Sequence, residues 1–357
     1  MRFQEPYHLF SDPLQYYNEM IADIDNAEKY IYLETFRVGK DEIGERFNVA
    51  LTKKAAQGVD VKVLIDYWGA GSIDQDYFSS LTKNGGEVRF FEKIKFNTDI
   101  FTRGHRRNHR KLLLIDDKIS YIGSSNITGY NMNWRESVLR MKSDITPTFA
   151  DLFNQDFKNY NKYTFYKLSS TKLVNHNSFD IVRDVPSITR KLINTKFIRL
   201  IKSAKSRVTI ETPYFLPGFF LRKSLMDAAQ RGVSVNIILP RHSDVSLIDI
   251  LRNKYFGTLY KAGVNILFYE LNNLHSKMLL VDKKVFAIGS SNFDYRSFRY
   301  MYEIMLIGNN KEIARQINNH MKVTITGSVK FDYENWKKRS LINKLFEWIL
   351  LPFRHLL

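Results

Sequence analysis

The chain of 357 residues carries two copies of a histidine that is followed two positions later by a lysine, His109 with Lys111 and His275 with Lys277. Residues two apart in a β-strand point to the same face of the sheet, so each pair is expected to project one imidazole and one ammonium together. One such pair alone is most often an edge-strand pair without function. Two copies with the same surroundings suggest a site that uses both.

Hydroxyl and amide groups follow each pair at the same distance. The sequence Gly-Ser-Ser-Asn ends at Asn126 in the first copy and at Asn292 in the second, 17 residues after each histidine. If the two copies pack face to face about a pseudo-twofold axis, the imidazoles, ammoniums and amides meet at one place. Like charges held together cost free energy unless an anion lies between them, so stability alone does not favour this cluster.

The anion that fits this cluster is a phosphodiester. We expect the two lysines and the two asparagines, with Ser124 and Ser290 as further substrate-binding groups, to hold the phosphate oxygens and to stabilise the five-coordinate transition state without a metal or other cofactor. One neutral histidine attacks phosphorus and forms a phosphohistidine, while the other, protonated, donates to the leaving alkoxide. An alcohol or water then accepts the group. The near-symmetry of the sequence does not decide which histidine is the nucleophile.

Two aspartates belong to the same repeated pattern. Asp116 and Asp282 each lie seven residues after their histidine, where an apolar run ends and a turn is expected. We include them in the candidate catalytic set, with a role in holding the turn rather than in making bonds.

The elements that position these groups also occur twice and in the same order. Apolar, β-rich runs alternate with segments of helical spacing, which predicts an α/β fold of two homologous lobes, each a mixed β-sheet flanked by helices. Over the segments that carry the histidines, HRKLLLIDDKISYIGSSN and HSKMLLVDKKVFAIGSSN, 11 of 18 positions are identical without a gap. We expect one lobe in residues 1–170, a second in residues 171–325 and a C-terminal segment in residues 326–357.

The composition of the chain limits the classes of molecule that it is expected to bind. Lys and Arg number 54 against 37 Asp and Glu, a net charge of +17 that favours an anionic partner: nucleic acid, an acidic membrane surface or a phosphorylated substrate. There is no cysteine, which excludes disulfides, thiolate zinc sites and cysteine nucleophiles. No run of about 20 apolar residues occurs, so we expect no membrane span.

The C-terminal segment permits two interpretations. Leu341, Leu345 and Trp348 share one face of a predicted helix with lysines and an arginine nearby. The helix could pack on the protein core, or it could lie in the interface of an acidic bilayer.

An arginine-rich loop precedes the first histidine. We predict that Arg103, Arg106 and Arg107 form an electropositive rim that attracts acidic head groups. His105 and His109 have a spacing that could bind zinc on a helix, but no further ligands gather there, so we expect no metal.

The two His-x-Lys-x4-Asp motifs with their trailing Gly-Ser-Ser-Asn resemble the phospholipase D superfamily over nearly the whole chain. The segments NHRKLLLIDDKISYIGSSN, ETPYFLP and SSNFDYRSF further resemble its bacterial cardiolipin synthase branch. The resemblance implies a bilobal fold, aspartates that are mainly structural, and a glutamate after each motif that orients a histidine, here Glu136 and Glu303. It also favours His109 as nucleophile and His275 as acid and base.

The leading hypothesis is therefore a phosphatidyltransferase that converts two molecules of phosphatidylglycerol into cardiolipin and glycerol. A phospholipase D that passes the same intermediate to water is the alternative, and a nuclease or a lipid-binding scaffold is less favoured. We expect a cytoplasmic protein bound peripherally to the cell membrane, with an anionic phospholipid substrate and no obligate nucleic acid. Many members of the branch carry N-terminal spans that this sequence lacks, so membrane contact is expected to be peripheral.

Overall fold

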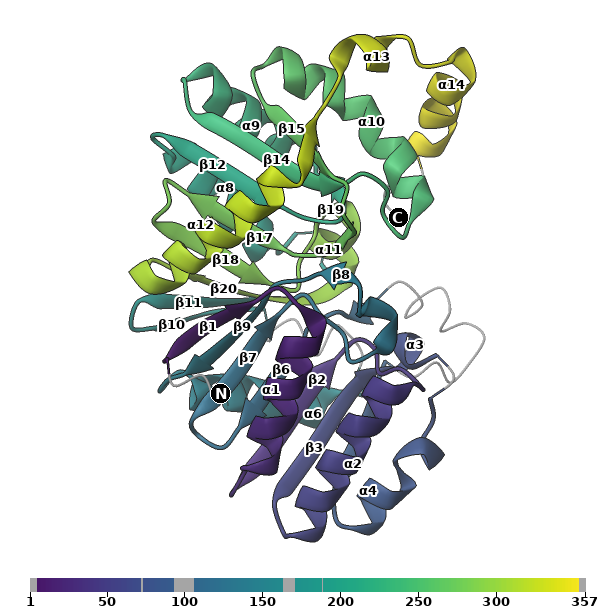
Figure 1. Ribbon diagram of the computed structural model, residues 1–357, viewed down its shortest axis with the longest axis vertical. Helices are drawn as coiled ribbons and strands as arrows, with labels where there is room; N and C mark the ends of the chain where they lie inside the picture. Colours follow the sequence, from purple (N-terminus) through teal and green to yellow (C-terminus); the bar gives the residue numbers. More distant parts are fainter. Residues whose placement is uncertain (1–4, 72, 93–105, 163–170, 188, 353–357) are drawn as a thin grey trace.

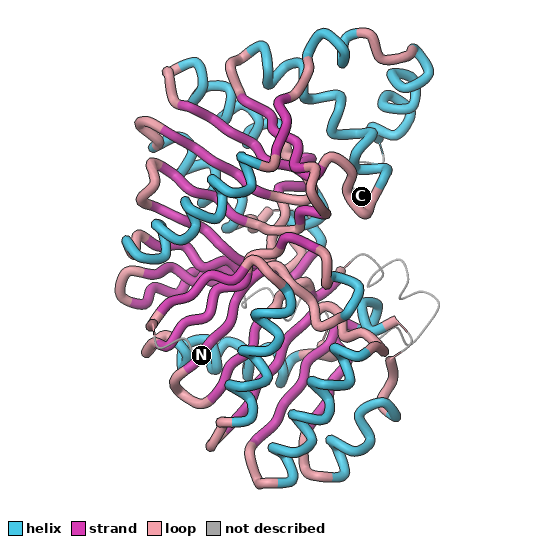
Figure 2. The backbone as a smooth tube through the Cα atoms, in the orientation of Figure 1, coloured by secondary structure: helices cyan, strands magenta, loops and turns pink. Residues whose placement is uncertain are grey.

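The computed structural model describes residues 5–71, 73–92, 106–162, 171–187 and 189–352. Two mixed β-sheets form the centre of the molecule, and helices cover their outer faces (Figures 1 and 2). The predicted α/β class with mixed sheets flanked by helices is confirmed.

The first sheet has seven strands. Their order across the sheet is β1 (Tyr7–Phe10), β9 (Val138–Lys142), β7 (Ile119–Gly123), β6 (Leu112–Ile115), β2 (Tyr30–Thr35), β3 (Asp60–Asp66) and β4 (Glu87–Phe91). The strands β2, β3 and β4 run parallel, while β1, β9, β7, β6 and β2 pair antiparallel.

The second sheet repeats this order. Its strands are β10 (Lys172–His176), β11 (Phe179–Asp184), β20 (Met301–Gly308), β18 (Val285–Gly289), β17 (Met278–Val281), β12 (Arg207–Glu211), β14 (Ser234–Pro240), β15 (Asn265–Tyr269) and β21 (Ser328–Lys330). A short strand from the first half, β5 (Arg107–Asn108), pairs with β20. Because β21 pairs with β15, strands of this sheet extend beyond residue 325.

Helices pack against both sheets. In the first half these are α1 (Pro13–Asp25), α2 (Glu42–Ala56), α3 (Tyr67–Ala70), α4 (Ser79–Lys83) and α6 (Thr146–Asn159). In the second half they are α8 (Leu192–Ser203), α9 (Phe219–Gln230), α10 (Ser246–Lys261), α11 (Tyr295–Tyr300) and α12 (Lys311–Thr326). The last two helices, α13 (Tyr333–Lys337) and α14 (Leu341–Leu350), pack against α10.

The histidine-bearing segments lead into strands that are buried on both faces. In β6, Leu113 and Ile115 pack into the core of the first half, whereas Leu112 and Leu114 pack into a core that both halves share. This alternation follows from the two-residue period of a strand. The shared core also contains residues of β17, β18 and β20, so the two halves are joined by apolar packing and the ends of their strands are held in fixed positions.

Candidate active site

Each histidine follows a short strand that pairs with a strand from the other half of the chain. In the first, β5 pairs with the start of β20, and the backbone N–H of His109 donates to the carbonyl oxygen of Tyr302 at 3.0 Å. Glu303 is the next residue, and its carboxylate oxygen Oε1 lies 3.0 Å from Nδ1 of His109. The first imidazole is thus anchored by a carboxylate of the second half.

The second histidine is held in the reciprocal way. The strand β16 (Asn273–Leu274) pairs with β8 (Trp134–Arg135), and the N–H of His275 donates to the carbonyl of Arg135 at 2.8 Å. Glu136 follows, and its Oε1 lies 2.9 Å from Nδ1 of His275. The two halves therefore exchange carboxylates, and both imidazoles retain slight solvent exposure, with side chains 12% and 7% exposed, while both glutamates are fully buried.

Ser124 and Ser290 hold these glutamates. Each hydroxyl donates to the glutamate of its own half, Ser124 to Glu136 and Ser290 to Glu303, and accepts a backbone N–H from the strand beside it. Both serines are fully buried. The expectation that they bind substrate is wrong, because their hydrogen-bonding capacity is used in placing the carboxylates.

The glycines that precede these serines permit the close packing. A Cβ atom on Gly123 would lie 2.2 Å from a backbone carbonyl oxygen of Ser137, and one on Gly289 would lie 2.2 Å from that of Ile304. Only glycine allows each serine to approach the strand that leads from its glutamate.

Both lysines are placed alike. Nζ of Lys111 donates to the carbonyl oxygen of His109 at 2.7 Å, and Nζ of Lys277 donates to that of His275 at 2.8 Å. Burial, followed by the charge of Lys277, lowers the pKa of Lys111 to about 7. Burial also lowers the pKa of Lys277 to about 8. Two buried ammoniums at one site favour the binding of an anion.

Asn126 and Asn292 retain unused polar atoms. The side-chain oxygen of each is buried and has no hydrogen-bond partner. An orphaned buried carbonyl oxygen costs free energy that a bound hydrogen-bond donor recovers. Each oxygen can therefore accept a hydrogen bond, whereas the predicted contact with phosphate oxygens requires the side-chain NH2 groups.

Asp116 and Asp282 lie at the far ends of β6 and β17, where the chain turns. The Asp116 carboxylate accepts the backbone N–H groups of residues 28–30, and the Asp282 carboxylate accepts those of residues 205–207. Both residues have a positive φ, 51° and 52°. They fix the turns that begin β2 and β12, in keeping with the expected role in holding the turn rather than in making bonds.

The arginine-rich rim is only partly as expected. Arg103 lies outside the described residues, and Arg106 is half-buried. Arg107 is fully buried, with Nη1 3.4 Å from the carboxylate of Asp66, so it cannot belong to an exposed rim. The neighbouring Arg110 is also buried and pairs with Asp156 at 2.6 Å. These guanidiniums position the backbone before and after His109.

The two histidines differ in their electrostatic surroundings. Burial, followed by the charges of Lys111 and Lys277, holds the pKa of His109 well below its usual value, and burial raises the pKa of its partner Glu303 to about 7. Burial also lowers the pKa of His275, but here the charge of Glu136 opposes the shift. Although burial alone would raise the pKa of Glu136, His275 and Lys277 hold it below its usual value. Burial thus favours the neutral form of both imidazoles, and the charge of Glu136 partly offsets this effect at His275.

Sequence reasoning missed several residues around the site. Asp66 accepts the N–H of Asn108 at 2.7 Å and thereby fixes the residue before His109. Arg296, on α11, contributes positive charge that lowers the pKa of His109, and its buried Nε has no hydrogen-bond partner. A guanidinium so placed can bind a second anionic group. The only sequence signal was the position of Arg296 four residues after Asn292.

His320, expected to be an ordinary packing or surface residue, is part of a buried network behind His275. Its Nε2 lies 2.7 Å from Oε1 of Glu211, and its Nδ1 lies 2.6 Å from the hydroxyl of Ser11. Ser276, between His275 and Lys277, is 3.4 Å from the same Nε2. This network ties α12 to the strand that bears the second motif.

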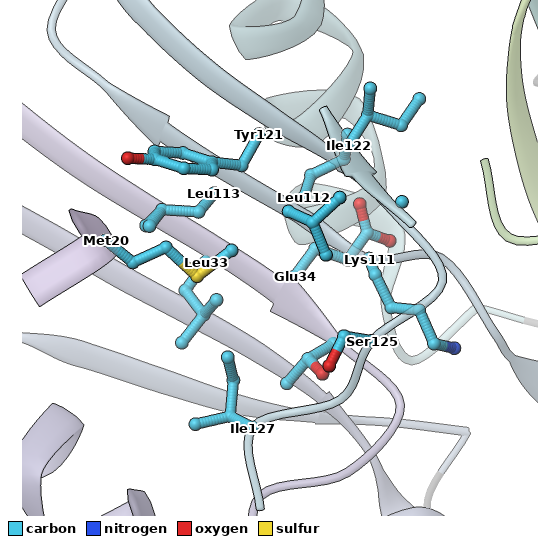
Figure 3. A pocket seen from close by; sticks show the side chains of 13 residues that line it. Met20, Leu33, Glu34, Lys111, Leu112, Leu113, Tyr121, Ile122, Ser125 and Ile127 are labelled. Carbon is cyan, nitrogen blue, oxygen red and sulfur yellow. The ribbon is translucent and has the colours of Figure 1, made fainter. Parts of the chain in front are cut away.

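A small cavity lies behind Lys111, between α1 and the strands β2, β6 and β7 (Figure 3). Its volume of about 20 Å³ suits a single water molecule, not a lipid head group. Figure 3 shows the Lys111 side chain extending away from the apolar side chains Met20, Leu33 and Ile127 that line it.

Two further properties concern only the part of the chain that the structure describes. It contains no cluster of three or more histidine, aspartate or glutamate side chains suited to a metal ion. None of its helices combines the length and the apolar character needed to cross a bilayer.

Comparison with known proteins agrees with this geometry. The family described as "Cardiolipin synthase, PLD-like domain" matches residues 20–160 and 197–325. A cardiolipin synthase of Clostridium perfringens is 33% identical over 96% of this chain and 75% of its own length, and one of Listeria monocytogenes is 30% identical over 95% and 73%. The crystal structure of phosphatidylserine synthase from Haemophilus influenzae has the same fold, with a TM-score of 0.78 at 15% identity over 98% of this chain and 93% of that one.

Proposed function

Because the chain belongs to the cardiolipin synthase family of PLD-like domains and is an enzyme of the phospholipase D superfamily, we propose that it transfers a phosphatidyl group between two phosphatidylglycerol molecules. The products are cardiolipin and glycerol, and the intermediate is a phosphohistidine on His109. The observation that carries the proposal is the exchange of carboxylates, which anchors each imidazole on the opposite half of the chain.

In the first step, Nε2 of His109 attacks phosphorus, because Nδ1 is engaged with Glu303. The bond between phosphorus and the glycerol oxygen breaks, and the imidazolium of His275 gives its proton to that oxygen. Glycerol leaves, and the phosphatidyl group remains on His109. The carboxylate of Glu303 stabilises the positive charge that develops on the phosphorylated imidazole.

In the second step, the hydroxyl of another phosphatidylglycerol attacks the same phosphorus. Neutral His275 takes the hydroxyl proton, the phosphorus–nitrogen bond breaks, and His109 is restored. Lys111 and Lys277 would hold the non-bridging oxygens in both steps, since a phosphodiester anion compensates two buried ammoniums. The side-chain NH2 groups of Asn126 and Asn292 would donate to the same oxygens.

The electrostatic surroundings support this division of roles. A nucleophile must be neutral and an acid must be protonated, and the pKa of His109 is held well below its usual value while Glu136 favours the charged form of His275.

A product assay tests the proposal. The purified chain is incubated with phosphatidylglycerol vesicles, and the lipids are separated by thin-layer chromatography. We expect cardiolipin and one glycerol per cardiolipin; phosphatidic acid instead would show that water is the acceptor, and no product would overturn the enzyme assignment. His109→Ala and His275→Ala should each lower turnover by roughly three or more orders of magnitude, because the two act as a unit. The exposed His242 offers a matched control, and His242→Ala should retain activity.

A trapping experiment tests the intermediate. When phosphatidylglycerol labelled in its phosphate is mixed with enzyme and quenched in alkali, label should become bound to the protein at His109. Label on His275 instead would reverse the two roles, and no bound label would contradict the covalent route.

A further inference from the structure

The helix α14 has an inverted distribution of polarity. Most of its apolar side chains face solvent, with Leu341 81% and Trp348 68% exposed, whereas its acidic residue Glu347 is 4% exposed. Leu350, at its end, packs against the core of the second half. Four further apolar residues of the helix are exposed: Ile342, Leu345, Phe346 and Ile349. A helix packed on a protein core buries its apolar face and exposes its charges, so this arrangement points to an apolar partner outside the chain.

Specific contacts hold the helix in this orientation. Glu347 pairs with Arg339 through Nε at 2.7 Å, and both side chains are largely buried. Just before the helix, Trp336 donates from Nε1 to the carbonyl oxygen of Asn253 on α10 at 3.0 Å. Its ring packs so closely on Gly257 that a Cβ there would lie 2.2 Å from it. The apolar face is therefore presented outward by fixed contacts with α10.

Positive charge surrounds the exposed face. Lys337, Lys338 and Lys344 are all exposed next to it, and Glu334 is the acidic partner of the first of them. The whole chain has a net charge of +17. A surface that combines large apolar side chains with lysines fits the interface of a bilayer containing anionic lipid, where the apolar groups enter the acyl boundary and the ammoniums meet phosphates.

The helix lies on the side of the molecule that carries the active site. In Figure 1, α14 is on the same right-hand side as α3, α11 and β8. Exposed aromatic residues occur there in both halves. In the first half, Trp68 lies two residues after Asp66, which accepts the backbone N–H of the residue before His109. In the second half, Phe219 and Phe220 begin α9. They follow β13 (Phe215–Leu216), the strand that pairs with the segment after Asn292.

We propose that the exposed face of α14 binds the interface of a bilayer that contains anionic phospholipid and so holds the active-site side of the enzyme against its substrate. The ten residues of α14 span about 15 Å at 1.5 Å per residue, half of a hydrocarbon core of about 30 Å, so the helix lies on the bilayer rather than crossing it. The role in delivering substrate rests on the proposed function; the binding of the membrane does not.

The test compares three forms of the full chain: wild type, the variant Leu345→Glu with Trp348→Glu, and a control with Val323→Glu and Leu173→Glu. The control residues are also exposed and apolar but lie on α12 and β10, toward the left in Figure 1. Each form is floated with vesicles of phosphatidylcholine alone or mixed with phosphatidylglycerol, and synthesis is measured both on vesicles and in detergent micelles. Thermal unfolding confirms that all three forms are folded.

We expect the α14 variant to lose at least about tenfold in partitioning onto mixed vesicles, because two apolar side chains that would enter the bilayer become charges, while the control binds as wild type does. Its synthesis in micelles should be unchanged. A second pair, Lys338→Glu with Lys344→Glu, should reduce binding to mixed vesicles and leave the weaker binding to phosphatidylcholine unaffected.

The inference is overturned if the α14 variant partitions as wild type does. It is also overturned if light scattering shows that wild type is a dimer and the α14 substitutions dissociate this dimer without loss of vesicle binding. In that case a second copy of the chain would cover the exposed face. If no form makes cardiolipin in micelles and the α14 variant still loses binding, the membrane surface is supported and the proposed function fails.

Discussion

Above the pKa of Glu303, which burial raises to about 7, replacing Glu303 with Gln removes one negative charge from the active site and little else. In the structure, Oε1 of Glu303 faces Nδ1 of His109 at 3.0 Å, and Oε2 accepts the hydroxyl of Ser290. A glutamine can keep both contacts, with its oxygen toward the histidine and its amide toward the serine. Ser290 then donates to the carbonyl oxygen of Ile304, which already lies 3.3 Å away. The substitution therefore tests the charge rather than the geometry.

In the proposed mechanism His109 acquires a positive charge when it is phosphorylated, and the size of the effect follows from that charge. With the centres of the imidazolium and the carboxylate about 4 Å apart and an effective dielectric constant of about 20, their attraction is about 4 kcal/mol. The dipole of the glutamine recovers part of this. A loss of about 3 to 4 kcal/mol in the transition state corresponds to a fall of roughly 10² to 10³ in kcat.

The assay is a single-turnover measurement of glycerol release, with Glu136→Gln as the matched variant. Glu136 stabilises the charged form of His275, so its replacement lowers the pKa of the acid. The alkaline limb of the pH profile should then move to lower pH. The reasoning is refuted if Glu303→Gln releases glycerol within about threefold of the wild-type rate, because a charge loss of this size cannot be so nearly silent.

Three further outcomes are expected. In the free enzyme, Lys111 and Lys277 lose their protons as pH rises through their pKa values of about 7 and about 8, so kcat/KM should fall across this range. The kcat value reports the complex in which a bound anion stabilises both charges, so it should fall only at higher pH. A kcat/KM that rises from pH 7 to 9 would contradict this. His320→Ala leaves the buried carboxylate of Glu211 without its partner at 2.7 Å and should lower the free energy of unfolding by about 3 kcal/mol in urea titrations, whereas an unchanged midpoint would show that water replaces the imidazole. Gly289→Ala places a methyl group 2.2 Å from a carbonyl oxygen of β20, and we expect a loss of about 1 to 3 kcal/mol, seen as a lower Tm; unaltered stability would mean that the strands separate freely.

The fold could be predicted because the sequence pattern that indicates it occurs twice in the chain. Each half carries the same succession of apolar strands and helices, and the strands are long enough for their period to show. Leu112 to Ile115 is apolar at every position because both faces of β6 are covered by packed side chains. Asp116 and Asp282 were likewise expected at turns, and the structure places them there.

The exchange of carboxylates could not be predicted from local sequence. It depends on β5 and β16, which are two residues long and leave no periodic pattern. The burial of Arg107 has a similar origin, since Asp66, which compensates its charge, lies 41 residues earlier in the chain. From sequence alone a run of arginines indicates a solvated surface, and only the fold brings the distant carboxylate to it.

The near-symmetry of the two motifs is broken by what surrounds their glutamates. Glu136 accepts from Asn131 as well as Ser124 and faces His275, so its charge is stabilised and its pKa falls below the usual value. Glu303 is equally buried, but burial and then the nearby lysines keep the pKa of His109 well below its usual value, and burial raises the pKa of Glu303 to about 7. In the proposed mechanism, His275 suits the acid because its glutamate favours the charged form, and His109 suits the nucleophile because its pKa is held well below its usual value. Unequal stabilisation of charge around two nearly identical sequences would thus support the proposed difference in roles, and exchanging Asn131 for Leu should weaken the difference by raising the pKa of Glu136 and lowering that of His275.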